Sequence, residues 1–187
     1  MSACSRNEIK EFIETLHYSH NINGVMSTHC FKLMDGESLI GAMIYGSMGM
    51  ANAWKKYGDS ESDVIELRRL VLIDDTKHNA ESFFIGATLR WLKKNTEIKT
   101  VVSYADPNNG HTGVIYRASN FKHVGMTSPG KVLIWNGRQY HDKAIRTKYK
   151  GELKPFAKKL KEALINGEAV YHHTKGKYIY VFKLRHS

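Results

Sequence analysis

The sequence predicts an α/β (α+β) protein with a mixed central sheet flanked by helices and a basic C-terminal extension from about residue 131. Residues 64–125 alternate strand, helix, strand, helix and strand patterns. Strands joined by such a helical crossover lie parallel in one sheet. The strand patterns Thr28–Leu33 and Ser38–Tyr45 are joined by a short turn, so they add an antiparallel hairpin.

The spacing of apolar residues predicts the elements that precede residue 64. A first helix is expected over Asn7–Ser19, where Ile9, Phe12 and Ile13 recur at helical intervals. The hairpin follows, and a long polar connection without a clean period then leads to residue 64.

The central elements bring polar residues to strand ends. We predict a strand over Val64–Ile73, a helix over about Asn79–Asn95 with Asn79 as its N-cap, and a strand over Thr100–Tyr104. The two strands should be adjacent, parallel and splayed at their carboxyl ends, where ligands bind in open α/β sheets. A short helix over Thr112–Ser119 and a strand over Phe121–Gly125 complete the pattern.

The extension carries further patterns but no separate linker. Strands Val132–Trp135 and Arg138–His141 form a predicted hairpin around an Asn-Gly turn. A basic amphipathic helix is expected over Leu153–Asn166, with apolar residues Phe156, Leu160 and Leu164 on one face, and a closing strand over Tyr178–Leu184. We therefore expect a single domain over residues 1–187.

Composition and charge narrow the setting. The 187 residues carry a formal net charge of +10, with a sequence pI near 9.5, which favours a polyanionic partner over none. A basic, soluble surface without a partner is the alternative. No apolar run is long enough for a membrane span, and the two cysteines, Cys4 and Cys30, fit a reducing cytoplasm rather than a disulfide framework.

The string VIYRASNFKHVG resembles the second conserved motif of the GNAT superfamily of N-acetyltransferases, a helix bearing a Tyr, a turn, an aromatic residue and a strand. Tyr116, Phe121 and Gly125 fill those places, and Asn120 stands where the superfamily usually has Gly. The preceding ELRRLVL and ESFFIGATLRWLKK are similar to its acyl-CoA-binding strand and helix. One departure is the segment DDTKHNAES, which lacks the glycines that bring backbone N–H groups to a pyrophosphate.

A narrower resemblance joins ELRRLVL, ESFFIGATLRWL, SYADPNNGHTGVIYRASNF and HVG, which together are similar to the phage Mom family. The resemblance implies a divergent acetyltransferase fold that converts adenine in phage DNA to a carbamoylmethyl derivative, in the host cytoplasm, and so evades restriction. Two alternatives stay open: an acyl-CoA-dependent N-acetyltransferase acting on a small molecule, protein or tRNA, and a non-catalytic DNA-binding module. The donor is unknown, with acetyl-CoA or another acyl donor as candidates.

The catalytic candidates follow the second central strand. Asp106 and His111 are the acid/base candidates, and Tyr116 would protonate a departing group. Capping of the PNNGH turn by Asp106, a first-turn structural role for His111 and core packing of Tyr116 are the structural alternatives. Ser103 and Tyr104 alternate, so one faces the site and the other the core.

Substrate or cofactor contacts are expected from Glu66 and Arg68, which share one strand face as a possible ion pair, and from Asn109, Asn120 and Tyr18. A solvated strand face is the alternative for the charged pair. We predict no metal site, because the spacing of histidines near Tyr18 is weak evidence; iron on His, Asp and Tyr ligands is an open but unsupported option.

Basic residues interleaved with aromatic ones suit phosphate contacts and base stacking. Modifying a base in duplex DNA requires flipping it from the stack, with an aromatic surface to receive it. Trp54 is that candidate, and Trp135 is a weaker one because packing in its hairpin explains it better. The expected DNA contacts are Arg146, Lys148, Lys150, Lys154 and Trp54.

Overall fold

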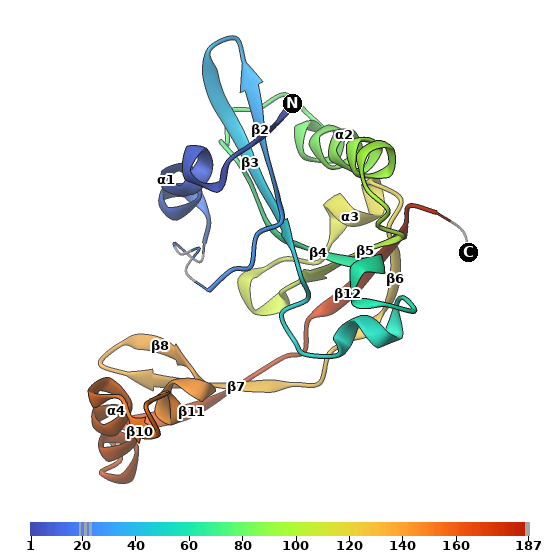
Figure 1. Ribbon diagram of the computed structural model, residues 1–187. Coiled ribbons are helices and arrows are strands. Elements are labelled where there is room, and N and C mark those ends of the chain that lie inside the picture. Colours follow the sequence, from blue (N-terminus) through green and yellow to red (C-terminus); the bar gives the residue numbers. More distant parts are fainter. Residues whose placement is uncertain (19, 21, 23, 186–187) are drawn as a thin grey trace. The chain divides into compact units, whose positions relative to one another are not determined.

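The computed structural model describes residues 1–18, 20, 22 and 24–185, and the chain divides into two compact units. The first, the core unit, contains residues 1–105, 112–125 and the chain from Tyr178 onward. The second, the extension unit, contains Asp106–His111 and Met126–Lys177. Figure 1 colours the core unit mainly blue to yellow, with its last strand in red, and the extension unit mainly orange. The single domain expected from the sequence stays a prediction.

Within the described residues, the core unit is built on a seven-stranded sheet of order β1-β2-β3-β4-β5-β12-β6. Antiparallel pairs join β1 to β2, β2 to β3, β3 to β4 and β5 to β12, whereas β4 and β5 are parallel. The mixed sheet expected from the sequence is confirmed. Its strands are β1 (Ser2–Cys4), β2 (His29–Asp35), β3 (Ser38–Gly46), β4 (Val64–Leu72), β5 (Thr100–Ala105), β6 (Lys122–Met126) and β12 (Tyr178–Lys183).

Helices cover both faces of this sheet (Figure 1). On one face, α1 (Arg6–Leu16) packs Ile9 and Ile13 against Ala42 and Ile44 of β3. On the other, α2 (Ala80–Asn95) and α3 (Val114–Ala118) contribute to the larger core around Phe31, Met43 and Tyr45. The first helix ends at Leu16, earlier than the predicted Asn7–Ser19, and Ser19 lies outside the described residues.

Of two predictions about helix starts, one is confirmed and one is wrong. Asn79 is the N-cap residue of α2, as predicted, although it is left-handed with φ 66° and its side chain makes no capping hydrogen bond; its carbonyl accepts from the Ser82 hydroxyl at 3.0 Å. The next helix, α3, begins at Val114 rather than Thr112, because Gly113 takes a left-handed conformation with φ 76°. His111 is therefore in the preceding turn and not at a helix N-terminus.

The extension unit holds a second sheet, β11-β7-β8, in which β7 (Gly130–Trp135) pairs antiparallel with both β8 (Arg138–His141) and β11 (Ala169–Thr174). The predicted hairpin is confirmed, with left-handed Asn136 and Gly137 at its turn. Strand β11 was not expected from the sequence.

Helix α4 (Pro155–Ile165) packs against this sheet through Ala157, Leu160 and Ala163. The predicted apolar face is present: Leu160 is fully buried, Leu164 packs against the same cluster, and Phe156, although 44% exposed, contacts the rings of Trp135 and Tyr140. A 3₁₀ helix η4 (Asp142–Arg146) and a small hairpin of β9 (Lys148–Tyr149) and β10 (Glu152–Leu153) join β8 to α4. No helix in the described ranges is long and apolar enough to cross a membrane.

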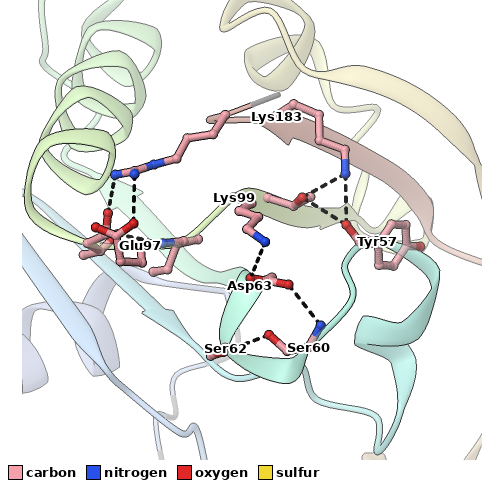
Figure 2. A network of polar contacts seen from close by, with 11 residues as sticks. Tyr57, Ser60, Ser62, Asp63, Glu97, Lys99 and Lys183 are labelled. Carbon is pink, nitrogen blue, oxygen red and sulfur yellow. Dashed lines mark hydrogen bonds and ion pairs between the residues drawn. The ribbon is translucent and has the colours of Figure 1, made fainter. Parts of the chain in front are cut away.

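A polar network ties together the beginnings of β4 and β5 and the end of β12 (Figure 2). Asp63, just before β4, forms an ion pair with Lys99, just before β5, at 3.2 Å. Lys183 of β12 donates to the Thr100 hydroxyl at 3.0 Å and to the Tyr57 carbonyl at 2.9 Å. These contacts fix the amino-terminal ends of the two parallel strands beside each other.

We predict that Gly113→Ala destabilises the protein by about 1–3 kcal/mol more than Gly110→Ala, because overpacking typically costs that much. Both glycines are left-handed, with φ of 76° and 77°, so both variants bear a similar backbone cost. Only at Gly113 would the new Cβ collide with the Tyr180 ring; at Gly110 nothing lies within 4 Å of the new Cβ. Urea unfolding followed by circular dichroism measures the difference, and equal losses would contradict it.

Candidate functional site at the splayed parallel strands

The parallel pairing of β4 and β5 is short. It runs from Val64 opposite Thr100 to Leu67 opposite Ser103, although β4 continues to Leu72 and β5 to Ala105. Beyond Leu67 the strands part at their carboxyl ends. The prediction of adjacent, parallel and splayed strands is confirmed, and this opening is the candidate site.

A β-bulge lies where the strands part. Ile44 of β3 faces Arg69 and Tyr45 faces Leu67, so Arg68 is the extra residue on β4. Bulges of this kind bend a strand and re-aim side chains, and they are common beside active sites. Arg68 is thereby directed toward the connection that follows β3, where it donates to the Ser47 carbonyl at 2.9 Å.

The predicted pairing of Glu66 with Arg68 is present. Arg68 Nη1 lies 3.7 Å from Glu66 Oε2, and both side chains are largely buried. The same Glu66 oxygen accepts from the Gly49 backbone N–H at 2.8 Å. Arg68 Nε is buried and makes no hydrogen bond within the described part of the chain. The pair therefore holds the connection after β3 close to the opening of the sheet.

Tyr116 is buried, with 8% of its surface exposed, and burial raises the pKa of its phenol to about 12. The Ser103 hydroxyl opposes this increase by hydrogen bonding, whereas the nearby acidic groups of Tyr18 and Glu66 add to it. Ser103, Tyr18 and Glu66, which were predicted from distant parts of the sequence, therefore lie close enough to Tyr116 to affect its pKa. At neutral pH the Tyr116 phenol keeps its proton, so it can donate one to a leaving group.

Tyr104 occupies the other face of β5. Ser103 is fully buried on the side of Tyr116, and Tyr104 is half-buried against a cluster that includes Trp54 and Tyr57. Burial, followed by the charge of Glu66, raises the pKa of Tyr104, and a hydrogen bond links its hydroxyl to that of Tyr57. Tyr57 was not predicted as a partner of Tyr104, because it lies in a connection without periodicity.

Asp106, Asn109 and His111 belong to the extension unit. Asp106 caps the 3₁₀ helix η3 (Pro107–Asn109), accepting from the Asn108 backbone at 3.0 Å and from its side chain at 2.8 Å, and it pairs with Lys177 at 3.2 Å. Burial opposes ionisation, but these partners outweigh it and lower the pKa of Asp106. The carboxylate is thus held ionised, which suits an anchor for an amine better than a strong base. His111 donates its backbone N–H to the Asp106 carbonyl at 3.1 Å.

The backbone conformation of Asn120 accounts for Asn at a position where the superfamily motif usually has Gly. It follows α3 with φ 63°, a left-handed conformation that Gly adopts freely and Asn tolerates. Its backbone N–H donates to the Arg117 carbonyl at 3.0 Å. Asn120 therefore serves the turn that sends the chain from Tyr116 toward β6.

The predicted DNA contacts fall in both units. Trp54 lies in the 3₁₀ helix η1 (Ala53–Lys56) of the core unit, with Lys55 Nζ 5.6 Å from its ring centre. The other four, Arg146, Lys148, Lys150 and Lys154, lie in the extension unit, which holds twelve of the 28 Lys and Arg residues but five of the 18 Asp and Glu residues. This unit therefore carries +7 of the net charge of +10.

Trp135 packs with Tyr140 and Phe156, as its structural alternative predicted.

Residue types that bind metals do not gather in the described ranges. No group of three or more His, Cys, Asp or Glu side chains there is arranged to hold an ion. Cys4 and Cys30 are free thiols on adjacent strands.

The bulged, splayed parallel pair and the mixed sheet around it define a GNAT-like acetyltransferase fold. A spermidine N-acetyltransferase from Vibrio cholerae aligns with a TM-score of 0.54 at 12% identity, over 98% of this chain and 94% of that one. The protein smu.2055 from Streptococcus mutans UA159 aligns with a TM-score of 0.52 at 11% identity, over 98% of both chains.

Within that fold, the chain belongs to the Mom protein family, whose model matches residues 1–187. A relative in Escherichia phage Mu, named methylcarbamoylase mom, is 28% identical over 136 residues. The match covers 71% of this chain and 56% of the relative, so this chain matches little more than half of that protein's length.

We predict that Tyr116→Phe weakens the alkaline destabilisation of the protein. The folded pKa of about 12 exceeds the ordinary value of 10.0, so the unfolded chain loses this proton first as pH rises, and stability falls between those values. The variant should remove up to about 3 kcal/mol of the fall in unfolding free energy, since each pKa unit is worth 1.36 kcal/mol. Urea unfolding at a series of pH values measures it. A Tyr116→Phe profile parallel to that of the unmodified protein would contradict this prediction.

Proposed function

We propose that this protein is a transferase that modifies the exocyclic N6 of adenine in duplex DNA to a carbamoylmethyl or related acyl-type group, protecting phage DNA from host restriction in the host cytoplasm. Membership of the Mom protein family and the methylcarbamoylase name of the phage Mu relative support the reaction class. The observation that carries the proposal is the position of Tyr116, hydrogen-bonded to Ser103 of β5 at the point where the pairing of β4 and β5 ends.

The chemistry gives each proposed residue a task. Adenine N6 is a weak nucleophile because its lone pair is delocalised into the ring, so it needs a positioned acceptor for its proton and an activated donor. A bond forms between N6 and the donor carbon as the bond to the leaving group breaks. In this scheme Asp106 holds the amine, His111 takes the N6 proton, and Tyr116 protonates the leaving group.

The loop before α2 argues for a donor other than acetyl-CoA. In this chain Asp74 and Asp75 precede the helix, and Glu81 lies in its first turn. Carboxylates at a helix N-terminus repel a pyrophosphate at the position where backbone N–H groups and the helix dipole would otherwise attract it. The donor proposed here therefore lacks a pyrophosphate bound in the ordinary superfamily manner.

Charge supports DNA as the substrate. The +7 extension unit suits phosphate neutralisation by Arg146, Lys148, Lys150 and Lys154. The amine of a paired base is not accessible to a buried proton donor, so the adenine would have to leave the stack. Trp54 is the proposed stacking surface for the flipped base.

We predict that DNA from cells expressing the protein contains a modified adenine nucleoside, detected by mass spectrometry, and that Tyr116→Phe lowers its amount about 10²–10⁴-fold, the usual contribution of a general acid. Tyr171→Phe, which removes a hydroxyl outside the proposed site, should leave the amount unchanged. Normal product from a folded Tyr116→Phe variant would remove this residue from the mechanism. Unmodified adenine with the active protein would refute the proposed function.

Two variants at Asp106 separate chemistry from turn capping. Asp106→Asn keeps an oxygen for the Asn108 N–H but removes the charge, and Asp106→Ala removes both. We expect each to lower the product about 10²-fold or more, because the charge holds the amine. Full activity in Asp106→Asn with loss only in Asp106→Ala would reduce Asp106 to a structural cap.

We predict weak or undetectable binding of acetyl-CoA, measured by isothermal titration calorimetry. The physical reason is the missing glycine loop and the carboxylates of Asp74, Asp75 and Glu81. Neutralising these three as Asn, Asn and Gln should strengthen binding if repulsion is the cause. Tight, saturable binding to the unmodified protein would contradict this prediction and favour an acyl-CoA-dependent N-acetyltransferase.

A further inference from the structure

A basic hollow of about 540 Å³ lies within the extension unit, between the β9–β10 hairpin, η4 and α4. This volume falls within the range of about 300–1,000 Å³ that is typical of ligand pockets. Its lining combines four cationic side chains, one carboxylate, two aliphatic side chains and a glycine, namely Arg146, Lys148, Lys158, Lys161, Glu152, Ile145, Leu153 and Gly151.

The cations of this hollow are only partly neutralised. Arg146 pairs with Asp142 at 2.8 Å and Lys158 with Glu152 at 3.7 Å, and both Arg146 and Lys158 are more than half exposed. Neither Lys148 nor Lys161 makes an ion pair within the described ranges. The hollow therefore retains positive charge that an anion could neutralise.

The hairpin beside the hollow presents an aromatic ring to solvent. Lys150 and Gly151 form its two-residue turn, both left-handed with φ of 49° and 85°, which is the geometry of tight hairpin turns. Tyr149 stands opposite Glu152 across the hairpin and is 66% exposed. Lys150 Nζ lies 5.6 Å from the centre of the Tyr149 ring. An exposed aromatic side chain between two lysines combines the two features that bind nucleic-acid strands, stacking and phosphate attraction.

We propose that the hollow and Tyr149 together bind a nucleic-acid strand. A backbone phosphodiester lies against Lys148, Lys158 and Lys161, the adjoining sugar contacts Ile145 and Leu153, and a neighbouring unpaired base stacks on Tyr149. This inference rests on the proposed function for the choice of DNA, and it extends it by naming where a strand is held outside the candidate active site. Lys158 and Lys161 were not among the DNA contacts expected from the sequence.

Fluorescence anisotropy of labelled single-stranded and duplex DNA across a salt series, with the full chain, tests the phosphate contacts. Lys158→Ala with Lys161→Ala should lower the magnitude of the slope of log affinity against log salt by up to about 0.9 on duplex DNA, since the one phosphate held in the hollow contributes about that much. Lys143→Ala with Lys159→Ala makes the same charge change in the same unit, but neither residue lines the hollow. This control should change the slope by less than half as much, and an equal change would overturn the site.

The stacking contact has its own test. Tyr149→Ala should weaken binding of single-stranded DNA roughly tenfold or more, whereas Tyr149→Phe, which keeps the ring, should bind like the unmodified protein. Equal affinity of all three would overturn the role of Tyr149.

A titration with inorganic phosphate tests whether the hollow binds free phosphate instead of the phosphodiester of a nucleic-acid strand. Nuclear magnetic resonance shifts in the hollow caused by phosphate, combined with unchanged DNA binding of the Lys158→Ala, Lys161→Ala variant, would show a free-phosphate site and overturn the proposal. Absence of DNA binding at low salt would also overturn it. The two proposals can fail separately. If DNA binding depends on the hollow but the protein yields no modified adenine, this site is supported and the proposed function is refuted.

Discussion

The limited pairing of β4 with β5 is the constraint on which the rest of the core unit depends. Hydrogen bonding between these parallel strands ends at Leu67 and Ser103, although both strands continue. The Asp63–Lys99 ion pair and the contacts of Lys183 hold the opposite ends together (Figure 2). With one end fixed, the right-handed twist of the strands and the bulge at Arg68 separate the other end. The opening is therefore a consequence of register.

Burial then gives the side chains at this opening their chemistry. Tyr116 packs between Phe121 and Tyr180, with ring centres 5.6 and 5.3 Å away, and this apolar setting disfavours its ionised form. The buried Tyr45 hydroxyl shares a 2.7 Å hydrogen bond with Thr88 and has a raised pKa for the same reason. Burial thus disfavours ionisation of both Tyr45 and Tyr116, and of these two phenols Tyr116 is the one proposed to act at the opening.

Charge is divided unevenly between the two units. The core unit contains the majority of the carboxylates, including Glu66, which is engaged with Arg68 and the Gly49 backbone. The extension unit has a small apolar core around Leu133 and Leu160, and its twelve lysines and arginines exceed its five carboxylates by seven. A short α/β insertion with little core and much positive charge is suited to holding a polyanion, because phosphate attraction needs exposed cations rather than a deep pocket.

The sequence alone determined the type and order of most elements, since apolar periodicity and turn residues such as Asn136-Gly137 act locally. It also indicated Tyr116, Ser103, Glu66 and Tyr18 as candidate site residues, whose roles are part of the proposed function. Strand β11, the bulge at Arg68 and the place of Tyr57 required the tertiary structure, because pairing partners and register depend on residues far apart in the chain. The protonation states also required the tertiary structure. Burial raises the pKa of Tyr116, and Lys177, 71 positions after Asp106 in the sequence, helps to keep Asp106 ionised. Desolvation and ion pairing are properties of neighbours in space, and no local pattern encodes them.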